Sequence, residues 1–485
     1  MVAFSLKRFT PVLLFLGVSC SISMSKEEQV RNILPTPSIE TSVETSLNDP
    51  FFEKGQWPLA TWWTQYGSNE LNALIVSALQ KNPSIQAVRE RIEFASAQAV
   101  IAHSELLPLV YFNASDQLQY LSENGLYRAL NPNLTLGNQQ IDFSLSFSYE
   151  FDFWSKYRNL YRAALGRQKA AIAETAQVEL IVSTALAQTF FALQTNLLRK
   201  NYYEKLWQIR KNYFALQTKL LKNALYSKLV PLLSEEAVFE AKQRVYEIEQ
   251  EISINKHTIN TLAGRGPDEP IQLSEKLFAL SEKLAIPNDI SSELLSRRPD
   301  LMAQIWRMDA LAKEVGAAKA DFWPNVNILG LAGFQSGSWT KLFEWASKTI
   351  GAIPGLSLPV YTAGAIGANV DAKKALFNEA VYQYNDLILK SFQQVSDLLA
   401  IGKAVFGEKE KQTQIVANAT ARYKLTQDRQ KSGIDNGLTV YQFEEELIQK
   451  KLGDVELLYQ QYLVSISLIR ALGGGYLAEG NCCHE

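Results

Sequence analysis

The fourteen residues from Ile141 to Trp154, IDFSLSFSYEFDFW, alternate between apolar and polar side chains. Every second position from Ile141 to Phe153 holds Ile, Leu, Phe or Tyr, and the positions between them hold Asp, Ser or Glu. Because successive side chains of a β-strand point to opposite faces, this pattern predicts a strand with one apolar and one polar face. Such a strand suits a sandwich sheet with one solvated face, or a barrel wall with lipid outside and water inside.

The composition of the chain excludes several classes of protein. The chain has 485 residues, of which 47% are hydrophobic and 20% charged, and its formal net charge is -2. A charge so close to zero, without basic clusters, argues against a role in nucleic-acid binding. No apolar run of 18 residues follows the N-terminus, so transmembrane helices are not expected in the mature chain, whereas the strands of a β-barrel would escape that test.

Chemical sites are not expected either. The three cysteines, Cys20, Cys482 and Cys483, stand near the chain ends, so neither a disulfide framework nor a cysteine metal site holds the body of the chain together. The histidines lack the carboxylate–histidine patterns of metal or catalytic sites. We therefore expect a protein that is not an enzyme.

The first nineteen residues have the features of a signal peptide. A basic dipeptide precedes the apolar segment PVLLFLGVSC, residues 11–20, which is too short to span a bilayer. The end of this segment, from Gly17 to Cys20, resembles a bacterial lipobox, in which the cysteine thiol receives lipid. We expect lipidation of Cys20 and, by analogy from Ser21, a place in the outer membrane. The alternative is an ordinary signal peptide that contains an incidental cysteine.

The chain contains an internal duplication. Residues 82–112 align with residues 298–328 at an offset of 216 positions. Each copy opens an expected helix with a proline, Pro83 or Pro299, and a second proline stops that helix about 25 residues later. A strand is expected after each helix, so the two halves of the chain should share one order of elements.

Two long segments without proline follow the strands, at residues 155–230 and 364–472, and the first of them contains a single glycine. Their apolar residues recur at alternating steps of three and four, which is the spacing of a coiled-coil seam. The first ascending helix would hold roughly 69 residues and measure roughly 100 Å. Each segment must turn back, and the expected turns are residues 224–229 and 433–438. Helices of this length need lateral partners to bury their apolar stripes.

The sequence contains four convincing strands, at about 108–121, 140–153, 324–335 and 353–361. Four strands cannot enclose a lumen, since about eight are needed even to surround a core of side chains. Three chains that contribute four strands each would give about twelve. We therefore predict a mixed α/β membrane protein, in which a trimeric twelve-stranded β-barrel is continuous with a long α-helical barrel.

The expected organisation is a duplicated unit of helix, strand, strand and long helical hairpin. The first repeat should contain a hairpin at 155–263, and the second a hairpin at 364–472. The expected boundaries are 1–19 for the signal peptide, 20–60 for a lipid-anchored extended arm, 61–265 for the first repeat, 266–290 for an equatorial linker, 291–476 for the second repeat and 477–485 for the tail.

Residues 294–328 resemble the most recognisable stretch of the TolC-type outer-membrane efflux channels, in the NodT-like lipoprotein branch that serves resistance-nodulation-division pumps. The sequences RRPD at 297–300 and ADFWP at 320–324 carry the match. GLSLPVY at 355–361 is similar to the family's second-half strand, and RALGGGY at 470–476 to its usual end. The resemblance covers nearly the whole mature chain.

This resemblance implies a homotrimer that shares one twelve-stranded barrel in the outer membrane and one twelve-helix tunnel in the periplasm. It implies no cofactor and no chemistry. The partners that it implies are outer-membrane lipid, an inner-membrane pump that supplies the energy, and a periplasmic adaptor protein at the helix tips. The channel would be closed near those tips at rest and would open when the inner helices untwist.

The resemblance also places a tip motif at the two turns between the long helices. In the first half, the motif's glycine is replaced by Ala224. The expected adaptor-docking residues are Ala224, Leu225, Ser227, Gly433, Asp435 and Asn436.

The candidate aperture residues are Asp428, Arg429 and Asp435, of which a trimer would bring three copies each to its axis. Rings of charge in a constriction set selectivity and can hold it shut through ion pairs. The alternative is that Asp428 and Arg429 are solvated helix-end charges and that Asp435 serves the turn. For Arg297 and Arg298 we expect a structural role near the middle of the molecule, and the alternative is contact with the substrate.

Three functions compete at this point. The first is a passive exit duct for drugs or other small toxic compounds in a tripartite efflux system. The second is an outer-membrane duct for type I protein secretion. The third is a soluble periplasmic coiled-coil scaffold without a pore, against which the alternating strands argue. The lipobox-like cysteine and the RRPD block favour the first.

Overall fold

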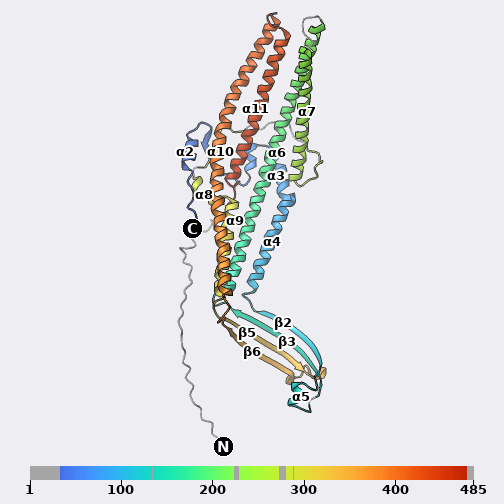
Figure 1. Ribbon diagram of the computed structural model, residues 1–485, viewed down its shortest axis with the longest axis vertical. Helices are drawn as coiled ribbons and strands as arrows, with labels where there is room; N and C mark the ends of the chain where they lie inside the picture. Colours follow the sequence, from blue (N-terminus) through green and yellow to red (C-terminus); the bar gives the residue numbers. More distant parts are fainter. Residues whose placement is uncertain (1–32, 134, 223–228, 272–279, 288, 478–485) are drawn as a thin grey trace.

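The computed structural model describes residues 33–133, 135–222, 229–271, 280–287 and 289–477. The molecule is elongated. A four-stranded sheet projects from one end of a set of long helices, and two helical hairpins form the opposite end (Figure 1). The signal peptide, Cys20 and the last eight residues lie outside the described residues.

The order of elements repeats in the two halves of the chain. The first half contains α3 (Asn69–Lys81), α4 (Pro83–Ser104), β2 (Leu109–Tyr120), α5 (Leu126–Leu130), β3 (Gly137–Phe151), α6 (Lys156–Lys222) and α7 (Leu229–Leu262). The second contains α8 (Ile290–Arg297), α9 (Pro299–Ala320), β5 (Asn325–Ser336), the 3₁₀ turns η2 (Trp339–Lys341) and η3 (Trp345–Ser347), β6 (Lys348–Ser357), α10 (Ala365–Lys431) and α11 (Gly437–Ala471). The N-terminal segment adds α2 (Glu40–Leu47), β1 (Phe52–Lys54) and η1 (Trp62–Tyr66), and β4 (Leu284–Ile286) lies between the halves.

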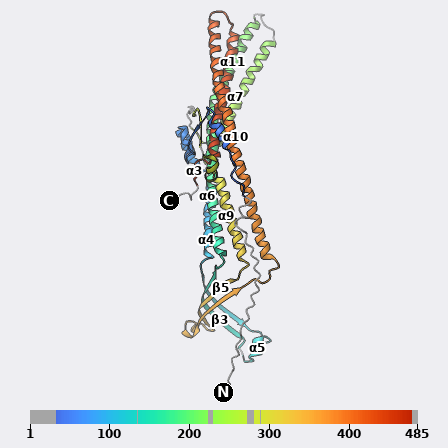
Figure 2. The same cartoon turned by 90° about the vertical axis from the view of Figure 1, so that its left-hand side faces the viewer.

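The long helices α6 and α10 have 67 residues each. At about 1.5 Å per residue, each is roughly 100 Å long. They run from the sheet toward the end of the molecule that the hairpins form (Figures 1 and 2). By length and composition alone, α6 is the one helix in the described part of the chain that could cross a bilayer, but 56% of its most apolar window is buried inside the protein, as in a core helix.

The sheet has the strand order β2-β3-β5-β6, and every neighbouring pair is antiparallel. Its last strand differs from the sequence expectation of 353–361, because β6 spans Lys348–Ser357. The reason is the register: Ser357 pairs with Asn325, the first residue of β5, so the residues after Ser357 have no strand to pair with. Pro354 is tolerated within β6 because β6 is an edge strand.

The N-terminal arm was expected to be extended over 20–60, and its described part is not. Residues 40–47 form α2, a helix in the proline-free stretch between Pro37 and Pro50. Residues 52–54 form β1, which pairs in parallel with β4 in a second sheet of two strands. The arm also contacts α10, where Lys403 lies 3.0 Å from Asp49. The arm is therefore packed against the second half rather than freely extended.

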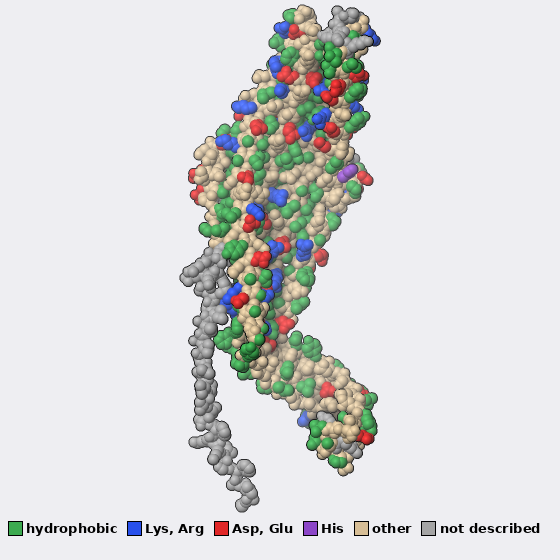
Figure 3. Space-filling view, in the orientation of Figure 1, with side chains coloured by type: hydrophobic (Ala, Val, Ile, Leu, Met, Phe, Trp, Pro, Cys, Tyr) green, Lys and Arg blue, Asp and Glu red, His purple; other side chains and the backbone are tan. Residues whose placement is uncertain are grey.

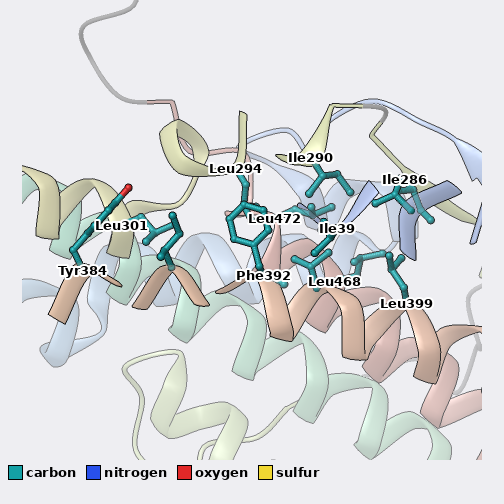
Figure 4. Packing of buried hydrophobic residues seen from close by; sticks show 14 of the residues in the cluster. Ile39, Ile286, Ile290, Leu294, Leu301, Tyr384, Phe392, Leu399, Leu468 and Leu472 are labelled. Carbon is teal, nitrogen blue, oxygen red and sulfur yellow. The ribbon is translucent and has the colours of Figure 1, made fainter. Parts of the chain in front are cut away.

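Two hydrophobic clusters form most of the core. One joins the N-terminal arm and β4 to α9, α10 and α11, and includes Ile39, Leu294 and Phe392 (Figure 4). The other lies around α3, α6 and α7, and Tyr462 of α11 completes it by stacking on Phe191 with ring centroids 4.0 Å apart. Both clusters lie in the middle of the molecule, between the four-stranded sheet and the far ends of the hairpins.

Candidate functional site

The tip of the second hairpin is a tight turn between α10 and α11. Gly433 has φ 74°, a conformation that side chains with a Cβ rarely adopt. Its N–H bonds to the carbonyl of Gln430, and the N–H of Ile434 bonds to that of Arg429, which together form a Schellman motif. Asn436 caps α11, because its Oδ1 accepts a bond from the N–H of Thr439 at 3.0 Å. Local hydrogen bonds thus explain both the glycine that ends α10 and the asparagine that begins α11 in the tip motif.

Arg429 and Asp435 form a bidentate ion pair across this turn. Nε of Arg429 lies 2.7 Å from Oδ2 of Asp435, and Nη2 lies 3.0 Å from Oδ1. The hydrogen bonds from Arg429 lower the pKa of the Asp435 carboxyl below its ordinary value. The side chain of Asp435 is 18% exposed and that of Arg429 is 50% exposed, so the pair lies at the surface of the protomer.

The third candidate aperture residue is not part of this pair. Asp428 bonds to Lys431 at 3.1 Å within the last turn of α10, and both side chains are exposed. The structure therefore brings together two of the three candidates, Arg429 and Asp435, and places Asp428 in a separate helix-end pair. Within one protomer, this agrees with a solvated helix-end charge for Asp428.

The tip of the first hairpin falls outside the described residues, and with it Ala224, Leu225 and Ser227. The sequence analysis missed a feature just beyond it. Leu232, Phe239 and Tyr246 of α7 are all exposed and recur at intervals of seven residues. An apolar stripe with this period suits packing against another helix. The heptad spacing of these apolar residues is the sequence signal that indicates it.

One face of the sheet is apolar across all four strands. Residues that are paired directly across antiparallel strands share a face, and the row Phe112, Leu145, Ala332 and Ile350 is one example. The side chains of Phe112, Leu145 and Ile350 are exposed in the protomer. An apolar surface of this extent is unusual on a protein surrounded by water.

The opposite face is predominantly polar. The adjacent row across the same strands is Asn113, Ser144, Gly333 and Thr349. On the side of the molecule that Figure 3 shows, charged side chains are numerous over the helices and few over the sheet. Among the described residues, the outer edges of β2 and β6 have no neighbouring strand, so the sheet is open on both sides.

Aromatic residues gather where the sheet joins the helices. Trp154 and Trp323 stack with ring centroids 4.8 Å apart, and Nε1 of Trp154 donates to the carbonyl of Pro324 at 2.8 Å. The hydroxyl of Tyr157 donates to Glu150, so this ring is tied to the sheet, whereas Trp154 and Trp323 are exposed.

A sheet with one apolar face, open edges and an aromatic border, attached to helices roughly 100 Å long, is the architecture of a channel protein of the outer membrane. The chain belongs to the outer membrane efflux protein family, whose model matches residues 74–265 and 290–474. This membership places the chain in the outer membrane, with its helical part in the periplasm.

Relatives and solved structures resemble the chain over most of its length. The multidrug resistance outer membrane protein MdtQ of Escherichia coli is 26% identical over 477 residues, covering 96% of this chain and 97% of the relative. The Campylobacter jejuni CmeC outer membrane channel superposes with a TM-score of 0.81 at 22% identity, covering 88% and 90%. The Vibrio cholerae outer membrane protein VceC superposes with a TM-score of 0.77 at 27% identity, covering 86% and 100%.

Proposed function

We propose that the protein is the outer-membrane channel of a tripartite efflux system, a passive duct through which drugs or other small toxic compounds leave the cell. One observation carries the proposal: a sheet too narrow to enclose a lumen has one apolar face and leads directly into two very long helical hairpins. A sheet of this kind suits a barrel wall with lipid on one side and water on the other.

The duct would be a homotrimer. The open edges of β2 and β6 offer unpaired backbone groups, which cannot remain unpaired inside a bilayer. Pairing β2 of each protomer with β6 of the next would give about twelve strands, enough to surround water. The exposed stripe of Leu232, Phe239 and Tyr246 on α7 supports a matching ring of helices, because it needs a neighbour to cover it.

The periplasmic tips would form the closed end. Three copies of the Arg429–Asp435 pair, brought together around an axis, would place alternating charges at the narrowest point. A periplasmic adaptor protein would contact the tip residues of both hairpins and open the passage. An inner-membrane pump would supply the energy, since the chain itself is proposed to be no enzyme.

Lipid would attach the N-terminus to the membrane through Cys20, as expected for the NodT-like lipoprotein branch. The packing of α2 and β1 is compatible with this arrangement, because it holds the described part of the arm against the middle of the molecule. Replacing Cys20 with serine should abolish incorporation of labelled palmitate, and incorporation that persists would contradict this assignment.

Drug accumulation tests the proposed transport function. Cells that lack the gene should accumulate more of a fluorescent drug than the parent strain, and a plasmid copy should restore the parent level. Unchanged accumulation together with lost secretion of a protein would favour the alternative, a type I secretion duct. Recovery in the soluble fraction would contradict both. The relatives named multidrug resistance proteins support the drug-efflux assignment.

A further inference from the structure

The chain between β5 and β6 folds back over the far end of the sheet. We call residues 337–347 the flap. The rings of Trp339 and Phe343 lie 6.0 and 5.9 Å from that of Phe143, and the ring of Phe343 lies 6.0 Å from that of Phe334. Leu342 in the flap is completely buried. The flap is therefore a packed part of the fold.

The flap lies on the apolar face of the sheet. Phe143 and Phe334 are direct partners in the register, and both belong to the face of Leu145. Asp116 is on the same face, opposite Ile141, and its carboxylate accepts a hydrogen bond from Nε1 of Trp339 at 3.1 Å. If the apolar face is the outside of a barrel, the flap is outside it as well, and does not cover the polar face that would line the channel.

The outward side of the flap carries aromatic rings and lysines. Trp345 is 75% exposed, and Phe343 and Trp339 are exposed too. The ammonium group of Lys348 lies 4.2 Å from the centroid of the Trp345 ring. Tryptophan and lysine together are typical of the membrane–water interface, where a ring and an alkyl stem reach the apolar region and the polar groups stay hydrated.

The flap stands about one bilayer away from the aromatic border at the helical end. From Trp323 to Phe334 there are eleven residues along β5 and its approach. At about 3.3 Å per residue and a strand tilt of about 40°, they span roughly 28 Å. That height is close to the hydrocarbon thickness of about 30 Å.

We propose that the flap is an anchor that lies among the lipid headgroups of the outer leaflet, rather than a lid across the channel mouth. The inference rests on the proposed function, because it requires the apolar face to meet lipid. Recognition would not depend on anionic lipid, since the charges of Lys341 and Lys348 are balanced by those of Glu344 and Asp116. The ligand is the interfacial zone of the membrane itself, which aromatic rings enter by partition.

Tryptophan fluorescence in vesicles tests this inference. The protein is reconstituted in phosphatidylcholine, and the emission of Trp345 is obtained as the difference between the native protein and the variant Trp345→Phe. Bromine atoms placed shallow in the acyl chains should quench this emission more strongly than bromine placed deep, and aqueous iodide should quench it weakly. Adding phosphatidylglycerol should change none of these results.

A second reporter separates the inference from the proposed function. In the Trp345→Phe background, Leu145→Trp places a ring on the middle of the apolar face. Quenching of this ring by deep bromine, with Trp345 accessible only to iodide, would overturn the anchor alone. Absence of lipid quenching at both positions would overturn the barrel proposal as well.

Channel recordings test the alternative of a lid. The variant Trp345→Ser removes the most exposed ring and leaves in place the packing of Phe343 on Phe143 and the hydrogen bond between Trp339 and Asp116. An anchor predicts that the single-channel conductance of this variant is unchanged from that of the native protein. A severalfold rise in conductance would identify the flap as a lid and would overturn the inference.

Discussion

Arg298 and Asn82 make the same connection in the two halves of the chain, although one side chain is a guanidinium and the other a carboxamide. Nη1 of Arg298 donates to the carbonyl of Ala471 at 3.0 Å, and Nδ2 of Asn82 donates to the carbonyl of Leu262 at 2.9 Å. Ala471 is the last residue of α11 and Leu262 the last of α7. Each bond therefore fastens the start of a short helix to the end of the hairpin in its own half.

Replacing Arg298 should destabilise the second half strongly. Arg298 is 7% exposed and also forms a bidentate pair with Asp300, at 2.7 and 3.1 Å. Arg298→Ala would leave a partly buried carboxylate without its partner, which typically lowers the free energy of unfolding by about 3–5 kcal/mol. Urea unfolding in detergent, followed by circular dichroism, measures this loss.

The neighbouring arginine provides the control for this prediction. Arg297 pairs with Glu293 within α8 and lies over Trp57, and its side chain is more exposed than that of Arg298. Arg297→Ala should lower the free energy of unfolding by about 1 kcal/mol or less. Equal effects of the two substitutions would show that the hydrogen bond from Arg298 to Ala471 is not what stabilises the contact between the start of α9 and the end of α11.

The glycine after α11 should tolerate no side chain. Gly473 has φ 90°, and a Cβ at this position would overlap the carbonyl oxygen of Arg297. The equivalent Gly264 has φ 73° and approaches the carbonyl of Lys81 in the first half. Gly473→Ala should lower the free energy of unfolding by more than about 1 kcal/mol, through both strain and overlap.

A helical glycine with open space around it is the matched control for Gly473→Ala. Gly367 lies in α10, and nothing lies within 4 Å of a Cβ built there. Gly367→Ala should raise stability by about 0.5–1 kcal/mol, as alanine does at exposed helical positions. The same urea titration compares both variants, and a neutral Gly473→Ala would refute the close approach.

Sequence reasoning succeeded where a pattern extends over many residues. The alternation in Ile141–Phe153 and the coiled-coil steps in 155–222 depend on local side-chain periods, so strands and long helices were predictable. The pairing of β1 with β4 was missed, because three-residue strands show no period. The flap was missed for a different reason: its fold depends on contacts of Phe343 and Phe334 with Phe143, which lies far from both in the sequence.

The candidate site was predictable in part. The tip turn follows from local chemistry at Gly433 and Asn436, which sequence reasoning handles well. The sequence did not predict whether Asp428 or Asp435 is the partner of Arg429, because both carboxylates are close to Arg429 along the chain. The register of the turn decides it, and only the three-dimensional structure supplies that register.

The Arg429–Asp435 pair should keep the proposed channel closed at neutral pH. Asp435→Ala removes one partner, so a passage held by these charges should open more often. We expect low, flickering conductance in planar bilayers for the native protein and a severalfold increase for this variant. Asp428→Ala is the control and should leave the trace close to native. The reverse order of effects would assign the gate to Asp428.

Acid should weaken the same pair. Because Arg429 lowers the pKa of Asp435, the ion pair contributes fully above the ordinary pKa of 3.8 and is lost as pH falls through the lower, native value. Conductance of the native channel should therefore rise only below about pH 3.8. In Arg429→Ala the pKa of Asp435 returns toward 3.8, and the conductance should already be raised at pH 7. A native trace that changes between pH 7 and 5 would point to other groups.

A lysine on the apolar face of the sheet should disrupt membrane assembly, whereas a lysine on the polar face should not. Leu145 is in the middle of the apolar face and Ser148 on the polar face of the same strand, three residues away. A charge that faces lipid near the bilayer midplane costs about 2–4 kcal/mol, and a charge that faces the lumen avoids this desolvation.

Leu145→Lys should therefore reduce the amount of protein in the outer-membrane fraction and the band that migrates as a trimer without heating. Ser148→Lys should leave both near native and alter only the ion preference of the channel. Equal tolerance of the two lysines would mean that water, not lipid, covers the face of Leu145, and a one-sided loss at Ser148 would mean that the sheet is inverted relative to the bilayer.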